Sequence, residues 1–375
     1  MAGLYIHIPF CTKRCIYCDF FSQTEMKYKN EYIDAVIREL EIRKEYLDND
    51  PLETIYFGGG TPSQLQASDF GKLFDAVHRL FDTSACREIT LEANPDDISA
   101  RYIRELKELP FNRISMGLQS FMDEDLRFLN RRHSAAQAVK AVNDCRENGY
   151  TNLSIDLIYG LPGQTPEGWE ENVSKALSLD IPHLSAYHLI YEEGTALYTL
   201  KEAGKIQPVH EETSLRMFST LIDRLTENGY IHYEISNFAK PGMFSRHNTA
   251  YWTGKKYLGA GPSAHSYNGE NRQWNVSSLP AYLKGIRSGT PETETEILDL
   301  GTRYNDYIIT GLRTLWGIDL GKIAAEFGEQ TASYCKKQAR KHLSNGFLTE
   351  KENKYTLTRK GIFISDGIMS DLLLV

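Results

Sequence analysis

The sequence predicts an α/β protein: an incomplete (β/α)6 barrel of the TIM-like kind, followed by a smaller α+β domain with a winged-helix-like shape. Apolar, strand-like runs alternate with helical stretches about six times along the chain, which is typical of parallel strands covered by helices. Closer to the C-terminus, helical stretches are followed by a short hairpin. The length of 375 residues is sufficient for both units.

The strand-like runs lie at residues 4–8, 54–57, 88–93, 113–117, 153–159 and 184–190. Residues 31–46 illustrate the helical pattern between them, with an apolar side formed by Ile33, Val36, Ile37, Leu40 and Ile42. We assign residues 1–235 to the barrel, 236–290 to an irregular region rich in Gly, Asn and aromatic residues, and 291–375 to the C-terminal domain, with a linker at 288–296. In that domain we expect helices at 302–315, 320–327 and 331–343, a hairpin at 347–349 and 355–357, and a helix at 360–373.

Composition and charge predict a globular protein of the cytoplasm. The net charge of −8 argues against a general polyanion binder, because contact with phosphates depends on lysine and arginine. We interpret the basic side chains between Lys336 and Lys360 as a solvated helix face rather than a DNA-binding surface. The chain starts on a strand without a charged-then-apolar leader, and no apolar run approaches the roughly 18 residues of a membrane span. We therefore expect a cytoplasmic protein that binds no nucleic acid and forms no disulfides.

Three closely spaced cysteines follow the first strand, in Cys11-Thr-Lys-Arg-Cys15-Ile-Tyr-Cys18. Thiolates are soft ligands that suit iron–sulfur clusters and zinc. A structural zinc site needs four ligands, and the other three cysteines are far away in the sequence, so that only His7 would complete such a site. Three cysteines on a four-iron cluster would instead leave one iron open to a small molecule. The missing fourth cysteine favours a reactive iron–sulfur cluster, with zinc as the alternative.

Polar groups stand at the ends of the second to fifth strands, where a barrel of this kind places its chemistry. Gly58-Gly59-Gly60-Thr61-Pro62 follows the second strand, and consecutive glycines either let the backbone approach a ligand or form a tight turn. Glu92 ends the third strand and Asp156 interrupts the fifth. A carboxylate on a buried strand needs a partner, such as a ribose hydroxyl, an ammonium group or a salt-bridging side chain. Gln119 follows the fourth strand, with Arg131 beyond it.

The spacing CxxxCxxC at the end of a first strand resembles the signature of the radical SAM family. The resemblance implies a 4Fe–4S cluster held by Cys11, Cys15 and Cys18, with S-adenosylmethionine chelated to the open iron. It also implies reductive cleavage of that cofactor to a deoxyadenosyl radical. In such a protein the cofactor carries the chemistry, while the chain binds and orients it.

Four further motifs resemble the oxygen-independent coproporphyrinogen III oxidase group: Tyr5-Ile-His-Ile-Pro-Phe-Cys11, the glycine-rich loop 58–62, Gly117-Leu-Gln119-Ser-Phe, and Asp156-Leu-Ile-Tyr-Gly-Leu-Pro162. This resemblance spans nearly the whole chain. It implies that Tyr5 and Tyr17 lie near the cofactor. It further implies contacts to S-adenosylmethionine from Gly59, Gly60, Thr61, Glu92, Gln119, Arg131 and Asp156.

Two features depart from the oxidases of that group. The oxidases have CxxxCxxCxC and an N-terminal extension, whereas here Phe20 replaces the last cysteine and ten residues precede Cys11. Both features are similar to a sister branch, the HemW-type haem chaperones, which bind haem and deliver it to respiratory haem proteins.

A histidine-containing stretch, His247-Asn248-Thr-Ala-Tyr251-Trp252, resembles the HNxxYW motif associated with haem binding in that branch. Neutral imidazole is a good axial ligand for haem iron, and aromatic rings offer flat apolar surfaces to a porphyrin. We therefore expect His247 to bind haem, with His265 as the reserve candidate. The alternative is a histidine held in a loop by its neighbours.

The primary prediction is a haem chaperone with a radical SAM core that binds a 4Fe–4S cluster, S-adenosylmethionine and haem for delivery to respiratory haem proteins. The alternative is an enzyme: an oxygen-independent coproporphyrinogen III oxidase that decarboxylates propionates, or another porphyrin-modifying radical SAM enzyme. We expect no coproporphyrinogen oxidase activity and assign no catalytic residue. The resemblance also implies a recipient at the respiratory membrane, and it leaves a transient membrane contact and a dimer open.

Overall fold

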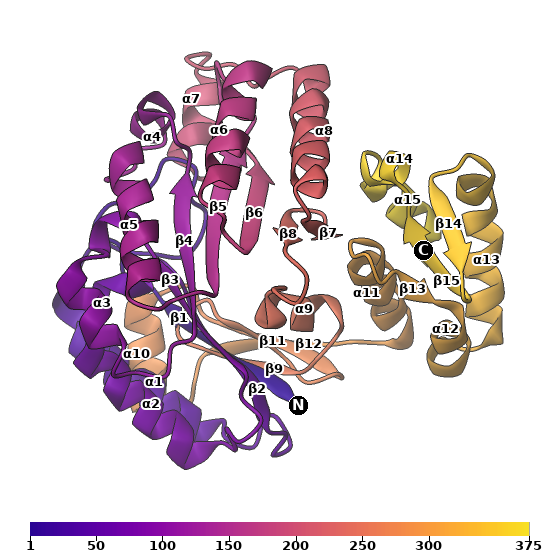
Figure 1. Cartoon of the computed structure of the whole chain (residues 1–375). Helices are drawn as coiled ribbons and strands as arrows, with labels where there is room; N and C mark the ends of the chain where they lie inside the picture. The colour runs from indigo at the N-terminus through magenta and orange to yellow at the C-terminus, as the bar shows by residue number, and fades with distance from the viewer. Residues whose placement is uncertain (375) are drawn as a thin grey trace.

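Six parallel strands form the centre of the structure, a computed structural model that describes residues 1–374. They are β1 (Ala2–Ile8), β2 (Leu52–Gly59), β3 (Glu88–Ala93), β4 (Arg113–Gln119), β5 (Leu153–Tyr159) and β6 (His183–His188), each paired in parallel with the next. All six overlap the strand-like runs of the sequence. The predicted α/β barrel is therefore confirmed (Figure 1).

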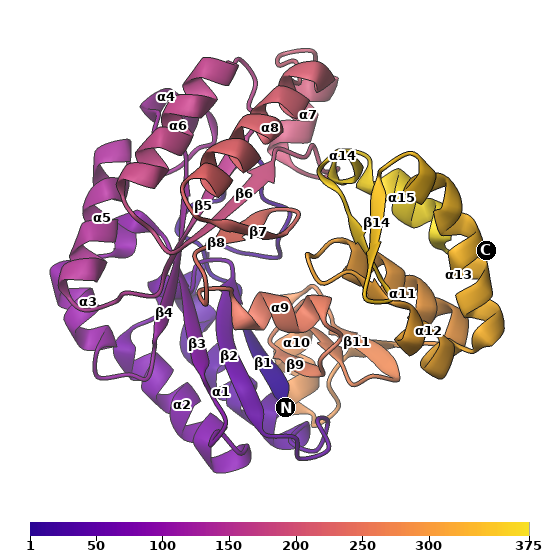
Figure 2. The ribbon, with the colours of Figure 1, turned by 45° about the vertical axis from the view of Figure 1, so that its right-hand side comes forward.

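Helices lie on the outer side of these strands, and Figure 2 shows them as an arc around the sheet. They are η1 (Met26–Tyr28), α1 (Lys29–Ile42), η2 (Pro62–Gln64), α2 (Ala67–Leu80), η3 (Pro95–Asp97), α3 (Ala100–Leu106), α4 (Asp123–Phe128), α5 (Ala135–Glu147), α6 (Pro166–Ser178), α7 (Ala196–Glu202) and α8 (Glu211–Glu227). The inner side of α2 is apolar: Phe70 and Phe74 are buried there, and the rings of Phe70 and Phe57 meet edge to face at 5.3 Å. Each such aromatic side chain contributes about 1.5–3 kcal/mol of hydrophobic stabilisation.

Alternation along each strand separates the outer core from the barrel interior. In β1, Leu4, Ile6 and Ile8 are fully buried in the apolar core that the helices cover. Successive side chains of a strand point to opposite faces, so Tyr5 and His7 point into the barrel. The same alternation puts Tyr56, Glu92 and Asp156 of β2, β3 and β5 inside, whereas Phe57 packs on α2 outside. The interior of the barrel is therefore the polar surface on which a site can be built.

Residues 236–290 are more regular than their composition suggested, and this expectation is corrected. They contain β8 (Asn237–Ala239), α9 (Arg246–Trp252), β9 (Tyr257–Ala260), β10 (His265–Tyr267), β11 (Asn271–Asn275) and α10 (Leu279–Arg287), and they lie between β7 (Ile231–Glu234) and β12 (Thr293–Ile297). β9 pairs in parallel with β1, and β12, which begins within the expected linker, pairs with β11. Strands of three to five residues are too short to show a clear period of two, and their partners lie far away in the sequence.

The resulting sheet has twelve strands in the order β12-β11-β10-β9-β1-β2-β3-β4-β5-β6-β8-β7. Its two edge strands, β12 and β7, do not pair with each other within the described residues. The barrel is therefore incomplete, as the sequence predicted.

The C-terminal domain is a small α+β unit with its own core. It comprises α11 (Leu300–Leu312), β13 (Ile318–Asp319), α12 (Leu320–Phe327), α13 (Glu329–Ser344), β14 (Leu348–Lys351), β15 (Lys354–Leu357), α14 (Arg359–Ile362) and α15 (Ser365–Leu372), and its sheet has the order β13-β15-β14. Tyr304, Ile308 and Cys335 are fully buried in this core. The helices and the hairpin agree with the sequence pattern, except that the helix expected at 360–373 is divided into α14 and α15.

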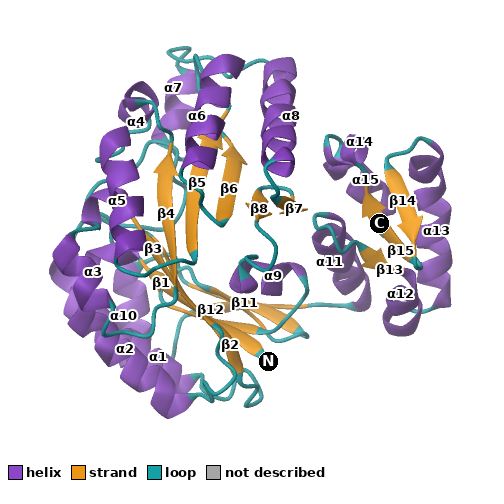
Figure 3. Cartoon of the chain, viewed as in Figure 1, coloured by secondary structure: helices purple, strands orange, loops and turns teal. Residues whose placement is uncertain are grey.

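Figure 3 shows the C-terminal domain on the side of the barrel where α9 lies. An ion pair between Arg272 of β11 and Asp306 of α11 joins the two units, as does a hydrogen bond from Arg359 to the Asp223 carboxylate of α8 at 2.8 Å. Among the helices of residues 1–374, none has both the length and the hydropathy that crossing a membrane requires.

Candidate functional site

A cavity of about 440 Å³ lies at the carboxyl ends of the strands and collects the predicted cofactor residues. Those that line it are Cys11, Cys15, Tyr17, Cys18, Gly59, Gly60, Thr61, Glu92, Gln119, Arg131 and Asp156. Parallel strands place their carboxyl ends at one rim, which is why residues more than a hundred positions apart converge here. Of the predicted site residues, Tyr5 and His247 lie instead on a neighbouring cleft.

The three cysteines lie on the loop after β1, and two polar groups from other elements reach their sulfur atoms. The Thr61 hydroxyl donates to Cys11 Sγ at 3.2 Å, and Arg131 Nη1 donates to Cys15 Sγ at 3.3 Å. Burial raises the pKa of the Cys11 thiol and raises that of Cys18 to about 11. Ligation therefore has to remove protons from these thiols, as metal binding by cysteine requires.

The donor set fits an iron–sulfur cluster better than the zinc alternative. Zinc would need His7 as a fourth ligand, but His7 Nε2 lies 2.8 Å from the Phe21 carbonyl oxygen and Nδ1 lies 3.0 Å from the Tyr5 hydroxyl. Both ring nitrogens thus already have hydrogen-bond partners. The three sulfur atoms do not converge as ligands of one metal ion. Within residues 1–374, no group of three or more His, Cys, Asp or Glu residues is placed to hold one.

The glycine-rich loop after β2 is shaped by close packing. A Cβ atom on Gly60 would lie 2.8 Å from the Ile8 carbonyl oxygen and 2.9 Å from that of Phe10, so no larger residue fits. The N–H groups of Gly60 and Thr61 donate to these same two oxygens, each at 2.8 Å. Gly59 has a φ of +104° and its N–H donates to Glu92 Oε2 at 3.2 Å. These three N–H groups therefore have partners within the protein and are not free to bind a ligand.

Two carboxyl groups face the cavity from β3 and β5, which lie on either side of β4. Removal from water raises the pKa of Glu92 to about 7 and that of Asp156 to about 6, and the Asp156 charge adds to the shift of Glu92. Glu92 also accepts a hydrogen bond from the Tyr56 hydroxyl at 2.6 Å. Poorly solvated carboxyl groups of this kind are suited to bind hydroxyl and ammonium groups of a ligand.

Arg131 connects the cysteine loop with the strand ends. Besides Cys15, its guanidinium donates from Nη2 to Asn94 Oδ1 and to the Gly117 carbonyl oxygen, both at 2.6 Å. Its Nε is buried and has no hydrogen-bond partner in the described residues. Gln119 adopts a φ of +70° where the pairing of β4 with β5 shifts register. Such strain in a residue other than glycine is often found at ligand sites.

The sequence analysis missed several residues in or beside this cavity. Asn94 orients Arg131, Tyr56 orients Glu92, and Tyr187 lines the wall from the end of β6. Asn94 lies two positions after Glu92, so its place beyond a strand end was a usable signal. Tyr56 has no such signal because it lies inside a strand, and only its neighbours across the barrel give it a role.

A second, larger cleft of about 1250 Å³ lies between the barrel and the C-terminal domain. Asn248, Tyr251 and Trp252 of α9 line it on one side, and Asp306 and Tyr307 of α11 line it on the other. The cleft adjoins the cofactor cavity, since both are lined by the same five residues: Asp19, Phe20, Gly59, Glu92 and Tyr187. A ligand in either space is therefore next to the other.

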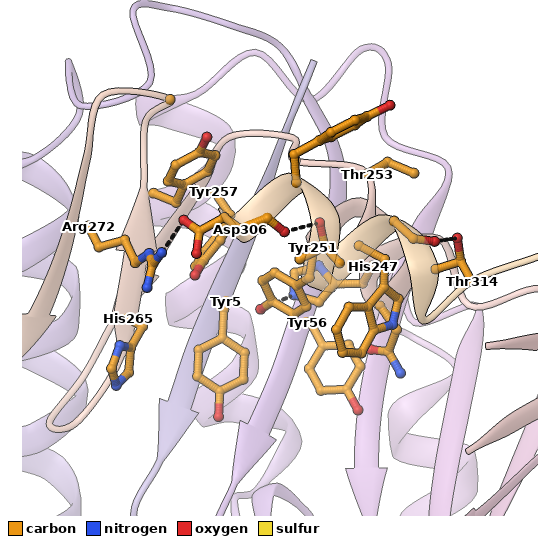
Figure 4. A pocket seen from close by; sticks show the side chains of 18 of the residues that line it. Tyr5, Tyr56, His247, Tyr251, Thr253, Tyr257, His265, Arg272, Asp306 and Thr314 are labelled. Atoms are coloured by element: carbon orange, nitrogen blue, oxygen red, sulfur yellow. Dashed lines mark hydrogen bonds and ion pairs between the residues drawn. The ribbon is translucent and has the colours of Figure 1, made fainter. Parts of the chain in front are cut away.

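His247 is buried inside the barrel beneath this cleft. Its Nδ1 lies 2.8 Å from the Thr54 hydroxyl and its Nε2 lies 2.8 Å from the Tyr251 hydroxyl, while its ring stacks on Tyr56 at 4.8 Å. Burial lowers its pKa to about 3, so the ring is neutral. Figure 4 shows Tyr5, Tyr56, His247 and Tyr251 grouped beneath α9. Ligation of haem by His247 stays a prediction, and it requires the Tyr251 hydroxyl to leave Nε2.

Comparison with known proteins agrees with this architecture. The model of the radical SAM superfamily matches residues 5–176, and that of the HemN C-terminal domain matches residues 298–364. The radical SAM match implies a 4Fe–4S cluster and S-adenosylmethionine. Among solved structures, coproporphyrinogen III oxidase (HemN) from Escherichia coli, described as a radical SAM enzyme, has 26% identity and a TM-score of 0.85, covering 99% of this chain and 89% of its own.

Two curated relatives match nearly the whole length of the chain. Heme chaperone HemW of Bacillus subtilis is 34% identical, covering 100% of this chain and 99% of its own length. Heme chaperone HemW of Lactococcus lactis is also 34% identical, covering 99% of this chain and 97% of its own. With its radical SAM core, its HemN-type C-terminal domain and this similarity along the entire length, the chain belongs to the HemW family of the radical SAM superfamily.

Proposed function

We propose that this protein is a haem chaperone that binds haem in the cleft between the barrel and the C-terminal domain and delivers it to respiratory haem proteins. The observation that carries the proposal is the position of the α9 motif: Tyr251 and Trp252 line a cleft of about 1250 Å³ that adjoins the cofactor cavity. The cleft exceeds the 300–1,000 Å³ of typical ligand pockets, so it can hold a large ligand. Its aromatic wall is suited to the flat faces of a porphyrin.

The chain's own residues would hold the cluster and the cofactor in the adjoining cavity. Cys11, Cys15 and Cys18 are proposed as the cluster ligands, with donors from Thr61 and Arg131 lowering the charge on two of the sulfur atoms. When bound, a cluster with one open iron supplies a binding point for S-adenosylmethionine and an electron source beside it.

The remaining predicted residues would position S-adenosylmethionine. Glu92 and Asp156 are suited to its ammonium or ribose groups, and the Arg131 guanidinium, which lines the cavity, is suited to a carboxylate. Gly59, Gly60, Thr61, Gln119 and Tyr17 complete the wall.

Tyr56 provides a physical link between the two sites. Its hydroxyl donates to Glu92 in the cofactor cavity, and its ring stacks on His247 below the cleft. Tyr5 lies beside both, with its ring 6.1 Å from Tyr56 and 6.4 Å from His247. Cofactor bound at Glu92 would bias the position of Tyr56 and so of α9. We therefore propose that S-adenosylmethionine regulates haem binding, and that the protein acts in the cytoplasm on a recipient at the respiratory membrane.

The test is a paired assay on one anaerobically reconstituted preparation. Haem is titrated and followed by absorbance, and the loaded protein is then mixed with the apo form of a respiratory haem protein. Coproporphyrinogen III is offered to the same preparation together with a reductant. Stoichiometric haem binding and transfer without vinyl-group formation are expected. Vinyl-group formation would contradict the proposal and favour the oxidase function.

A further inference from the structure

Three histidines line the cleft between the barrel and the C-terminal domain: His7, His247 and His265. An imidazole that ligates iron needs one ring nitrogen with a free lone pair. His7 and His247 do not offer one, because both nitrogens of each ring lie within 3.0 Å of a hydrogen-bond partner. Only His265 among these three has ring nitrogens for which no hydrogen bond is found in the described residues.

His265 is presented on a rigid support. It lies in β10, directly across the antiparallel ladder from Trp274 of β11, and its ring stacks on the Trp274 indole with centroids 5.8 Å apart and planes 25° apart. The side chain is exposed, whereas the next residue, Ser266, is fully buried and holds the strand by hydrogen bonds to Arg43 and Gly259. The strand is thus anchored on one face and offers the imidazole on the other. Figure 4 shows His265 on this hairpin, apart from the His247 group.

We propose that His265 is the axial ligand of the haem iron in this cleft, and that His247 is a positioning residue that holds α9. This inference rests on the proposed function, because it assumes that the cleft receives an iron porphyrin. The contacts of His247 agree with a positioning role: its backbone N–H donates to Glu88 Oε1 at 2.9 Å, and its ring fills the space left by Gly3, where an added Cβ would lie 3.3 Å from it.

One basic side chain of the cleft is suited to the anionic edge of such a ligand. Arg303 of α11 lines the cleft, is half-buried, and forms no side-chain ion pair or hydrogen bond within residues 1–374. Arg272 lines it too, but Asp306 and Glu296 neutralise its charge. A carboxylate-bearing ligand therefore finds one uncompensated guanidinium, a group that binds carboxylates in a bidentate manner. Since Arg303 and His265 come from different units, a bound porphyrin would join the barrel to the C-terminal domain.

The experiment compares the full-length wild type with His265→Ala and His247→Ala, with His78→Ala as the matched control. His78 is an exposed histidine on α2 and lines neither cavity. Each protein is titrated with haemin under anaerobic conditions, and Soret position and affinity are recorded. Circular dichroism and the melting temperature establish that each variant is folded.

His265→Ala should shift the Soret band and weaken haem binding by about tenfold or more, because loss of a metal ligand costs at least as much as loss of a supporting hydrogen bond. Added imidazole should restore the wild-type spectrum of His265→Ala, which a merely structural role would not allow. His78→Ala should match the wild type, and His247→Ala should keep the wild-type Soret position.

The possible failures are distinguishable. If the wild type binds no haem, the proposed function and this inference both fall. If the wild type binds haem and His265→Ala keeps its Soret position and affinity, the proposed function stands and His265 is not the ligand. Tyr251→Phe adds a second measurement, since it frees Nε2 of His247: an altered Soret band in this variant together with an unaltered one in His265→Ala would identify His247 as the ligand.

Discussion

Replacing Glu92 by glutamine should stabilise the cofactor-free protein at alkaline pH and should have little effect in acid. Removal from water, together with the Asp156 charge, raises the pKa of the Glu92 carboxyl from its ordinary value of 4.5 to about 7. The folded state therefore holds this proton more tightly than the unfolded chain does. As a result, the contribution of Glu92 to the free energy of unfolding is most favourable below pH 4.5 and is lost as the pH rises through about 7.

The magnitude follows from the size of the shift. A shift of about 2.5 pKa units corresponds to about 3 kcal/mol of stability that is lost above pH 8. At pH 5.5 the loss is only about 1 kcal/mol. Glutamine has no charge to desolvate, but its single acceptor oxygen can serve only one of the two donors, the Tyr56 hydroxyl or the Gly59 N–H. That loss costs about 1 kcal/mol. The variant should thus gain about 2 kcal/mol at pH 8.5 and about 0 at pH 5.5.

The assay is equilibrium urea denaturation of the metal-free protein at both pH values, with Glu108→Gln as the control. Glu108 is an exposed glutamate just beyond α3, and its replacement removes the same charge from the surface. The reasoning is refuted if Glu92→Gln changes the free energy of unfolding equally at pH 5.5 and pH 8.5. With a reconstituted cluster the same variant should bind S-adenosylmethionine more weakly, so that stability and ligand binding change in opposite directions.

Three further predictions concern single contacts. Gly60→Ala should lower the free energy of unfolding by about 1–3 kcal/mol, because the added Cβ would press on the Ile8 and Phe10 carbonyl oxygens. The control Gly71→Ala, in the middle of α2, has open space and should raise the free energy of unfolding by about 0.5–1 kcal/mol. Urea denaturation measures both values. Arg131→Lys should weaken S-adenosylmethionine binding about tenfold at unchanged iron content, since an ammonium cannot reproduce the planar set of donors to Cys15, Asn94 and Gly117. Calorimetry measures the affinity, and an unaltered value would remove Arg131 from the site. Trp169→Ala should lower the free energy of unfolding by about 3–5 kcal/mol in urea denaturation, because the indole is fully buried and donates to the Met217 carbonyl oxygen at 3.0 Å. A loss below about 1 kcal/mol would contradict this packing.

The parts of the fold that local patterns describe were predictable. All six central strands were visible as short strand-like runs, and the helices between them carry an apolar period near 3.6. The predicted residues of the cofactor cavity also followed, because every parallel strand brings its carboxyl end to the same rim. The depth of burial of Glu92 and Asp156, which raises their pKa values, required the structure, as did the roles of Tyr56 and Asn94.

The region after β6 was not predictable in the same way. β9 is four residues long and pairs with β1, whose residues lie about 250 positions earlier in the chain. Nothing within reach of a local pattern indicates that partner, and short strands rich in glycine look irregular. The surroundings of His247 were not predictable either: its motif predicts a haem ligand, which stays a prediction, while only the structure shows that Thr54 and Tyr251 contact its two ring nitrogens.

The amino-acid sequence by itself determined the alternation of strands and helices, the three cysteines after the first strand, and the polar residues at the strand ends, since each depends on spacing over a few residues. Only the tertiary structure decided which histidine has a free nitrogen and where the second cleft lies. The physical reason is that the availability of a side chain depends on what packs against it, and in this chain the packing partners come from strands and domains hundreds of residues apart.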